Sequence, residues 1–160
     1  MPRTYEPIAT TSLTSATTSI TFSSISSAYT DLVLIISAKN TTSLNNGKLN
    51  FNGDGGTNYS GTYMQGAGTA VTGRVSNTSS VYLMEFVTTD FSPVVVNIMD
   101  YSNTNTYKTI LAQGGANSDR IAFWTSIWRS TSAINSIEIA TFGGQFASGS
   151  TFSLYGIAAA

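Results

Sequence analysis

The acid–base chemistry open to this chain depends on carboxylates, because the sequence contains no histidine and no cysteine. Glycoside hydrolysis requires a facing pair of carboxylates, and spacing along strands does not exclude such a pair. Several acids, however, stand at predicted turns or strand starts, where Asp commonly bonds to nearby backbone. We therefore expect a protein that is not an enzyme, and keep a glycan-cleaving enzyme as an alternative. The eight carboxylates are Glu6, Asp31, Asp54, Glu85, Asp90, Asp100, Asp119 and Glu138.

The segment Asn52–Gly56 is similar to an acidic calcium-binding loop. It supplies a single carboxylate, Asp54, whereas an EF-hand loop uses several oxygen ligands and a distal Glu. Glycines at a hairpin turn explain the segment without a metal. The sequence thus predicts no metal and no cofactor.

Aromatic side chains are the candidates for partner contact. Trp124 and Trp128 are four residues apart, so on a strand they share one face, opposite Phe123 and Ile127. If Phe123 and Ile127 point inward, the two tryptophans stack on a sugar or bury against another subunit. The alternative is that both faces are covered within the domain. With four tyrosines in or beside predicted loops, the candidate partner or glycan contacts are Trp124, Trp128, Tyr59, Tyr63, Tyr101 and Tyr107.

The composition is unusually poor in charge. Charged residues make up 9% of the 160 residues, against roughly 25% in an ordinary domain. Hydroxyls and amides replace them, with 24 Thr, 23 Ser and 12 Asn. A surface with few long charged side chains suits packing against other protein, although a stable extracellular β-protein would look similar. The net charge of −1 favours neither nucleic acid nor a membrane as partner.

Apolar residues alternate with polar ones along most of the chain, a period typical of strands. Turn or bulge signals such as Gly114–Gly115 and Gly143–Gly144 punctuate the alternating segments. About ten short strands at this spacing predict an all-β fold, an antiparallel β-sandwich that is jelly-roll-like. We expect one domain over residues 1–160. The clearest strand candidates are Leu32–Ile36, Val81–Val87, Val94–Met99, Lys108–Ala112, Arg120–Trp128, Ile137–Phe142 and Thr151–Ile157.

Two segments lack this pattern. Residues 1–18 are interpreted either as an N-terminal arm that lies on a neighbouring subunit or as an edge strand. Residues 55–80 are rich in Gly, Thr and Asn. We expect a long irregular loop there, and loops of this kind often carry function.

The N-terminus has no apolar run after Arg3, so it does not read as a signal peptide. The longest apolar stretch, Leu32–Ile36, is too short to span a bilayer. We expect a protein made in the cytoplasm without an export signal, as a virion component released by lysis would be.

Four passages carry a resemblance to a known family. They are Met1–Thr11, the run from Phe22–Ile25 to Tyr29–Leu32, Phe51–Asp54 with Asn58–Ser60, and Thr151–Ile157. Over nearly its whole length the chain resembles small virion structural proteins of tailed bacteriophages. The resemblance implies a β-sandwich displayed on the particle as a homo-oligomer, a homotrimer. It carries over no catalytic residue.

The first expectation is therefore a non-enzymatic virion protein that decorates or cements the capsid, with other copies of itself and the major capsid protein as partners. The alternative is a tail-fibre or baseplate module that recognises a glycan on the host surface. The sequence leaves head and tail locations open.

Overall fold

The computed structural model describes residues 5–42, 45–116 and 120–158. Over these residues the chain is all-β, with twelve strands and no helix. The strands are β1 (Tyr5–Ser12), β2 (Ser19–Phe22), β3 (Asp31–Ala38), β4 (Asn45–Phe51), β5 (Tyr59–Ala67), β6 (Thr69–Thr78), β7 (Val81–Phe86), β8 (Ser92–Met99), β9 (Lys108–Ala116), β10 (Arg120–Trp128), β11 (Ile137–Thr141) and β12 (Thr151–Ile157).

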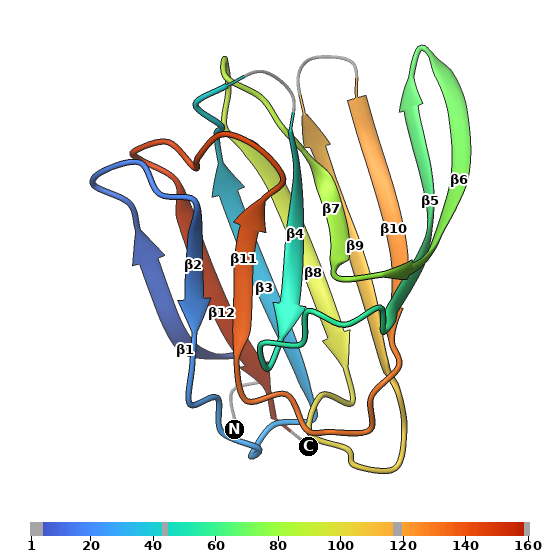
Figure 1. Cartoon of the computed structure of the whole chain (residues 1–160). Helices are drawn as coiled ribbons and strands as arrows, with labels where there is room; N and C mark the ends of the chain where they lie inside the picture. Colours follow the sequence, from blue (N-terminus) through green and yellow to red (C-terminus); the bar gives the residue numbers. More distant parts are fainter. Residues whose placement is uncertain (1–4, 43–44, 117–119, 159–160) are drawn as a thin grey trace.

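Two antiparallel sheets pack face to face. The large sheet has eight strands in the order β1-β12-β3-β8-β9-β10-β5-β6, and the small sheet has four in the order β2-β11-β4-β7. Figure 1 shows the small sheet covering one part of the large one, while the β5–β6 hairpin projects beyond it. The predicted β-sandwich is confirmed, with twelve strands rather than about ten.

The connectivity is that of a jelly roll widened on one side. Without two hairpins, β5–β6 and β9–β10, the remaining strands form sheets ordered β1-β12-β3-β8 and β2-β11-β4-β7. This interleaving of early and late strands in both sheets is the double Greek key of a jelly roll. Both inserted hairpins join the large sheet beyond β8. The large sheet therefore has an outer face much wider than the face that the small sheet covers.

The irregular loop expected over residues 55–80 is wrong, because most of that segment is the β5–β6 hairpin. Gly68 turns the chain with φ of +78°, a conformation that glycine adopts at little cost. Gly73 pairs with Tyr63, and a Cβ on Gly73 would lie 2.5 Å from the tyrosine ring. Most of β6 is exposed on both faces, so its sequence carries no apolar alternation.

The N-terminal segment contains an edge strand. β1 pairs with β12 from Tyr5↔Ile157 to Ser12↔Thr151, with a register shift after Pro7. Of the two interpretations of residues 1–18, the edge strand is the one that these contacts describe.

The core lies between the two sheets. Leu34, Ile36 and Val96 of the large sheet are fully buried, as are Leu49 and Ile139 of the small sheet. On the other face of β3, however, Ile35 is 44% exposed. The outer face of β3 is therefore covered at Val33, which is 5% exposed, and open at Ile35.

Candidate functional site

The predicted aromatic contacts are mostly inside the protein. Trp124, Trp128, Tyr59 and Tyr101 are buried. Tyr63 is half-buried, while Tyr107 is 51% exposed. Of the six candidates, Tyr107 is therefore the one most accessible to a partner.

Strand β10 turns its tryptophans inward. The exposed fraction of the side chain is 5% for Trp124, 47% for Phe123 and 59% for Ile121. Trp124 stacks on Tyr63 with ring centroids 4.4 Å apart and meets the edge of the Tyr82 ring at 5.8 Å. The interpretation that places the two tryptophans on the outer face is wrong, because β7 of the small sheet covers the face that they occupy.

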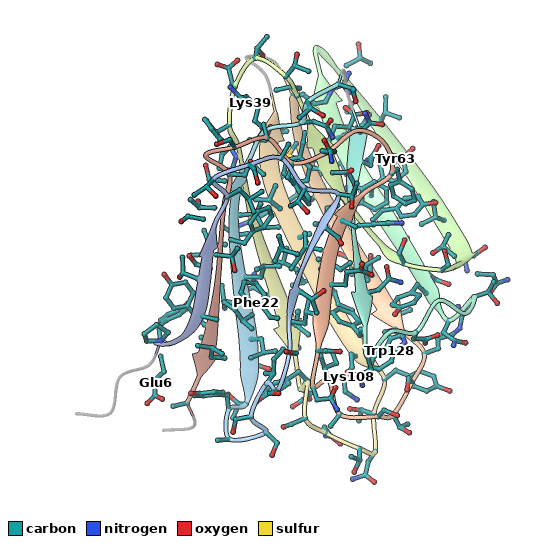
Figure 2. All side chains as sticks on the ribbon, turned by 60° about the vertical axis from the view of Figure 1, so that its left-hand side comes forward. Glu6, Phe22, Lys39, Tyr63, Lys108 and Trp128 are labelled. Carbon is teal, nitrogen blue, oxygen red and sulfur yellow. The ribbon has the colours of Figure 1, made fainter. Side chains whose placement is uncertain are left out.

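Trp128 belongs to a buried aromatic cluster at one end of the sandwich. Its ring stacks against Tyr59, and Phe51 lies 5.5 Å from it. Figure 2 shows Trp128 and Lys108 near the same end of the molecule, with Tyr63 nearer the other. Burial raises the pKa of Tyr59 to about 12. These groups hold the fold rather than a ligand.

The Asn52–Gly56 turn uses its carboxylate internally. Asp54 accepts hydrogen bonds from Trp128 Nε1, from the Gly56 N–H and from Asn58 Nδ2. Burial opposes ionisation of this carboxyl, but these donors outweigh it, so the pKa of Asp54 lies below its ordinary value of 3.8. Both carboxylate oxygens are engaged, which explains the acidic residue without a metal.

Lys108 is a fully buried cation that fastens two loops. Its Nζ donates to the carbonyl oxygens of Asn103 at 2.6 Å, Thr106 at 2.8 Å and Thr131 at 3.4 Å. Burial lowers the pKa of Lys108, and the nearby Asp100 carboxylate partly offsets this. The three carbonyl oxygens accept all three protons of the buried ammonium, so that the cation is fully hydrogen-bonded.

Other carboxylates also have structural partners. Glu85 forms an ion pair with Arg120, and Asp31 accepts the Asp100 N–H at 2.8 Å. Within the described ranges, no three His, Cys, Asp or Glu side chains gather closely enough to hold a metal. Asp119 lies outside the described residues.

The outer face of the large sheet carries a run of three adjoining hollows, whose lining residues lie on β8, β9, β10, β5 and β6. We call this run the outer trough. Neighbouring hollows share lining residues, Gln113 and Phe123 in one case and Thr125 in the other. Their volumes are about 310, 160 and 500 Å³. The hollows at the two ends are open to solvent and the middle one is more enclosed, so a ligand would lie across the surface of the sheet rather than inside a closed pocket.

One end of the outer trough is apolar. It is lined by Pro93, Val95, Ile121 and Phe123, with glycines of β9 between them. In the strand register, Ile35, Val95, Gln113, Phe123 and Met64 follow one another across five strands. Ile35, Phe123, Met64 and Ile121 are all substantially exposed. Exposed apolar residues gathered in this way mark a contact surface.

The other end of the outer trough is polar. Thr125 pairs with Thr62, which pairs with Arg74, and Thr109 lines the same hollow. In the part of the chain that the structure describes, none of these four side chains makes a hydrogen bond or ion pair. Ser60 Oγ accepts from Arg129 Nη1 and from the Asn77 N–H at 3.4 Å, so its own proton remains available.

The sequence separated the two faces of β10 correctly, but Phe123 was considered as a core residue, and neither Ile121 nor Arg74 was identified as a contact residue. The usable signal was the alternation of Ile121, Phe123, Thr125 and Ile127 with the tryptophans. Arg74 had no such signal, because the hairpin that carries it was taken as a loop.

Comparison with protein families gives no match to any family model, and comparison with curated proteins gives no significant match. Across the described residues, no helix is long and apolar enough to cross a membrane.

Proposed function

We propose that this protein is a non-enzymatic structural component of a tailed-bacteriophage particle, located on the particle surface as a capsid decoration or cement protein. The resemblance of its sequence to small virion proteins supports the proposal. Jelly rolls occur in viral capsid proteins and in lectins, which is a likeness of fold alone. The low charge of the chain favours contact between many identical copies.

The observation that carries this proposal is the open edge of the large sheet at β6. This edge strand is ten residues long, contains no proline, and has Arg74 as its one charged residue. An exposed edge of this kind accepts a strand from another chain. We expect β6 to form the contact with a second copy or with the capsid.

The other edges are protected. β1 carries Pro7 and a register shift, and both features discourage further pairing. β2 has four residues, and β7 carries the charged Glu85 and has a register shift in its pairing with β4. Protection of three edges makes the open fourth one a specific site.

The test combines microscopy with an edge variant. Antibody label on intact particles is expected over the head, and the purified chain is expected to bind empty heads as a homo-oligomer. Val71→Lys places a charge on β6 at a side chain 47% exposed, and should weaken assembly. Tyr5→Lys, on the protected edge β1, serves as control and should not. A strict monomer with no affinity for empty heads contradicts the proposal.

A second candidate function, recognition of a host glycan by a tail-fibre or baseplate module, is favoured by the outer trough. Its side chains combine an aromatic ring, amides and hydroxyls, which are the groups that bind sugars. A host polysaccharide is expected to bind with saturation, and Phe123→Ala should weaken that binding without unfolding. Phe91→Ala is the control, because Phe91 is similarly exposed but lies outside the trough. Label confined to the tail would favour this candidate over decoration.

A further inference from the structure

We infer that the outer trough binds an acidic saccharide, with a sugar carboxylate at Arg74, sugar hydroxyls on the threonines beside it and a sugar ring on Phe123. The inference rests on the second candidate function and names its ligand class. It follows from the charge, the hydrogen-bonding groups and the exposed aromatic ring of the trough.

The positive charge in the outer trough favours an anionic ligand. Among the described residues that line the outer trough, Arg74 alone carries a charge. Its guanidinium makes no hydrogen bond or ion pair within the part of the chain that the structure describes. A guanidinium presents paired donors whose geometry matches a carboxylate. Arg129, which donates to Ser60 at the rim of the same hollow, adds positive potential.

The hydroxyl and amide side chains that line the outer trough favour a ligand with many hydroxyl groups. Thr62, Thr109 and Thr125 line the polar hollow, and each hydroxyl can both donate and accept. The amides of Asn97 and Gln113 line the adjoining hollow and, within the described ranges, make no hydrogen bond. Sugar hydroxyls need partners of this mixed kind at short spacing, and neighbouring strands lie about 4.8 Å apart.

Phe123 supplies the apolar surface. Its side chain is 47% exposed and lines both the apolar and the middle hollow. The C–H face of a sugar ring packs on such an aromatic ring, as apolar surfaces generally do. The trough thus offers an aromatic group in its middle and a cation at its far end, an arrangement that an oligosaccharide can span.

The geometry favours a saccharide over an acidic peptide. An extended peptide gains most of its affinity by pairing its backbone with a sheet edge. Such an edge is open at β6, which carries Arg74, but the other lining residues lie on β8, β9, β10 and β5, which are each paired on both sides. A ligand there meets side chains alone, which suits a sugar with hydroxyls around its ring.

The test uses one probe in two forms. The acidic form is an oligosaccharide of alternating glucuronic acid and N-acetylglucosamine, and the neutral form has each carboxyl reduced to an alcohol. Calorimetry with the intact chain is expected to show binding of the acidic form and at least tenfold weaker binding of the neutral form. Arg74→Gln should lower affinity for the acidic form about tenfold and leave the neutral form unchanged.

Lys48→Gln is the matched control, because it removes one positive charge from β4 in the other sheet and should not alter binding. If both forms bind equally and Arg74→Gln has no effect while Phe123→Ala abolishes binding, the acidic ligand is excluded and the glycan function stands. If neither form binds, or if a poly-glutamate peptide binds more tightly than the acidic saccharide, the inference is overturned.

Discussion

Trp128 donates its indole Nε1–H to Asp54 Oδ2 at 2.7 Å, across 74 residues of sequence. The contact joins the end of β10 to the turn after β4, and so links the widened part of the large sheet to the small sheet. The sequence suggested a ligand for each of them, calcium for Asp54 and a glycan or protein partner for Trp128. Their hydrogen bond to each other gives both residues a structural role instead, because it holds two distant segments of the chain together.

Asp54→Ala is expected to destabilise the protein by about 2 kcal/mol, because it leaves the buried Trp128 N–H and the Gly56 N–H without their acceptor. Urea unfolding measures the change. Asp90→Ala is the control, since Asp90 is exposed and its loss should cost less than about 0.5 kcal/mol. Equal stabilities of the two variants would contradict the structural role of Asp54.

The same contact predicts how stability depends on pH. The pKa of Asp54 is below 3.8 in the folded protein, so the carboxylate stabilises the fold above pH 3.8. This stabilisation is lost as the pH falls through the folded-state pKa. The difference in unfolding free energy between wild type and Asp54→Ala should therefore be constant near neutral pH and shrink below pH 3.8. A difference independent of pH would rule out the ionised carboxylate as the cause.

Tyr59→Phe is expected to cost about 1.5 kcal/mol. The Tyr59 hydroxyl accepts the Phe51 N–H and donates to the Asp54 carbonyl, both at 3.1 Å. Because burial raises its pKa to about 12, the neutral phenol stabilises the fold below the ordinary pKa of 10.0, and this is lost as the pH rises toward 12. Absorbance near the phenolate band should show late titration from Tyr59 and from Tyr101, whose pKa burial also raises, and Tyr59→Phe should remove the Tyr59 part alone.

Two neighbouring aromatic residues on β10, Trp124 and Phe123, are expected to contribute very differently to the free energy of unfolding. Trp124→Ala should destabilise the protein by about 3–5 kcal/mol, because it opens a cavity beside Tyr63 and Tyr82. Phe123→Ala should change stability by less than about 0.5 kcal/mol, since its ring faces outward. Chemical denaturation of the two variants under identical conditions measures both. A large cost for Phe123→Ala would mean that the outer face is covered within the domain.

Lys108→Met is expected to cost about 3 kcal/mol, because it removes the buried ammonium that donates to carbonyls of two loops. Hydrogen exchange should show faster opening around Asn103 and Thr131 than in the core strands. Lys39→Met is the control, because Lys39 lies over the exposed ring of Phe91 and fastens no loop. If Lys108→Met is no less stable than Lys39→Met, the Lys108 ammonium does not hold the two loops in place.

The sequence predicted strands well where one face of the strand is buried and the other is exposed, or where both faces of the strand carry apolar residues. Predicted segments Arg120–Trp128 and Thr151–Ile157 coincide with β10 and β12. The hairpin over residues 59–78 was missed because β6 is largely exposed on both faces and has no apolar alternation to detect. The backbone of β6 pairs with β5 whatever the polarity of its side chains. Pairing of this kind requires no pattern of apolar residues, so the sequence does not reveal it.

The outer trough was missed for a related reason. It is assembled from Arg74, Thr109 and Phe123 on three different strands, and strand order depends on contacts between distant segments. The turn residue Asp54 was found from sequence, but its partner Trp128 could not be, because their contact depends on the packing of one sheet over the other.

By itself the sequence determined that the chain is a low-charge β-sandwich and that Trp124 and Phe123 lie on opposite faces of one strand. Alternation with period two is symmetrical, however, and does not say which face is inside. Tertiary structure decided that point, because β7 packs over the tryptophan face and leaves Phe123 exposed. A strand acquires its inner face from whatever covers it, and the covering strand here comes from a distant part of the chain.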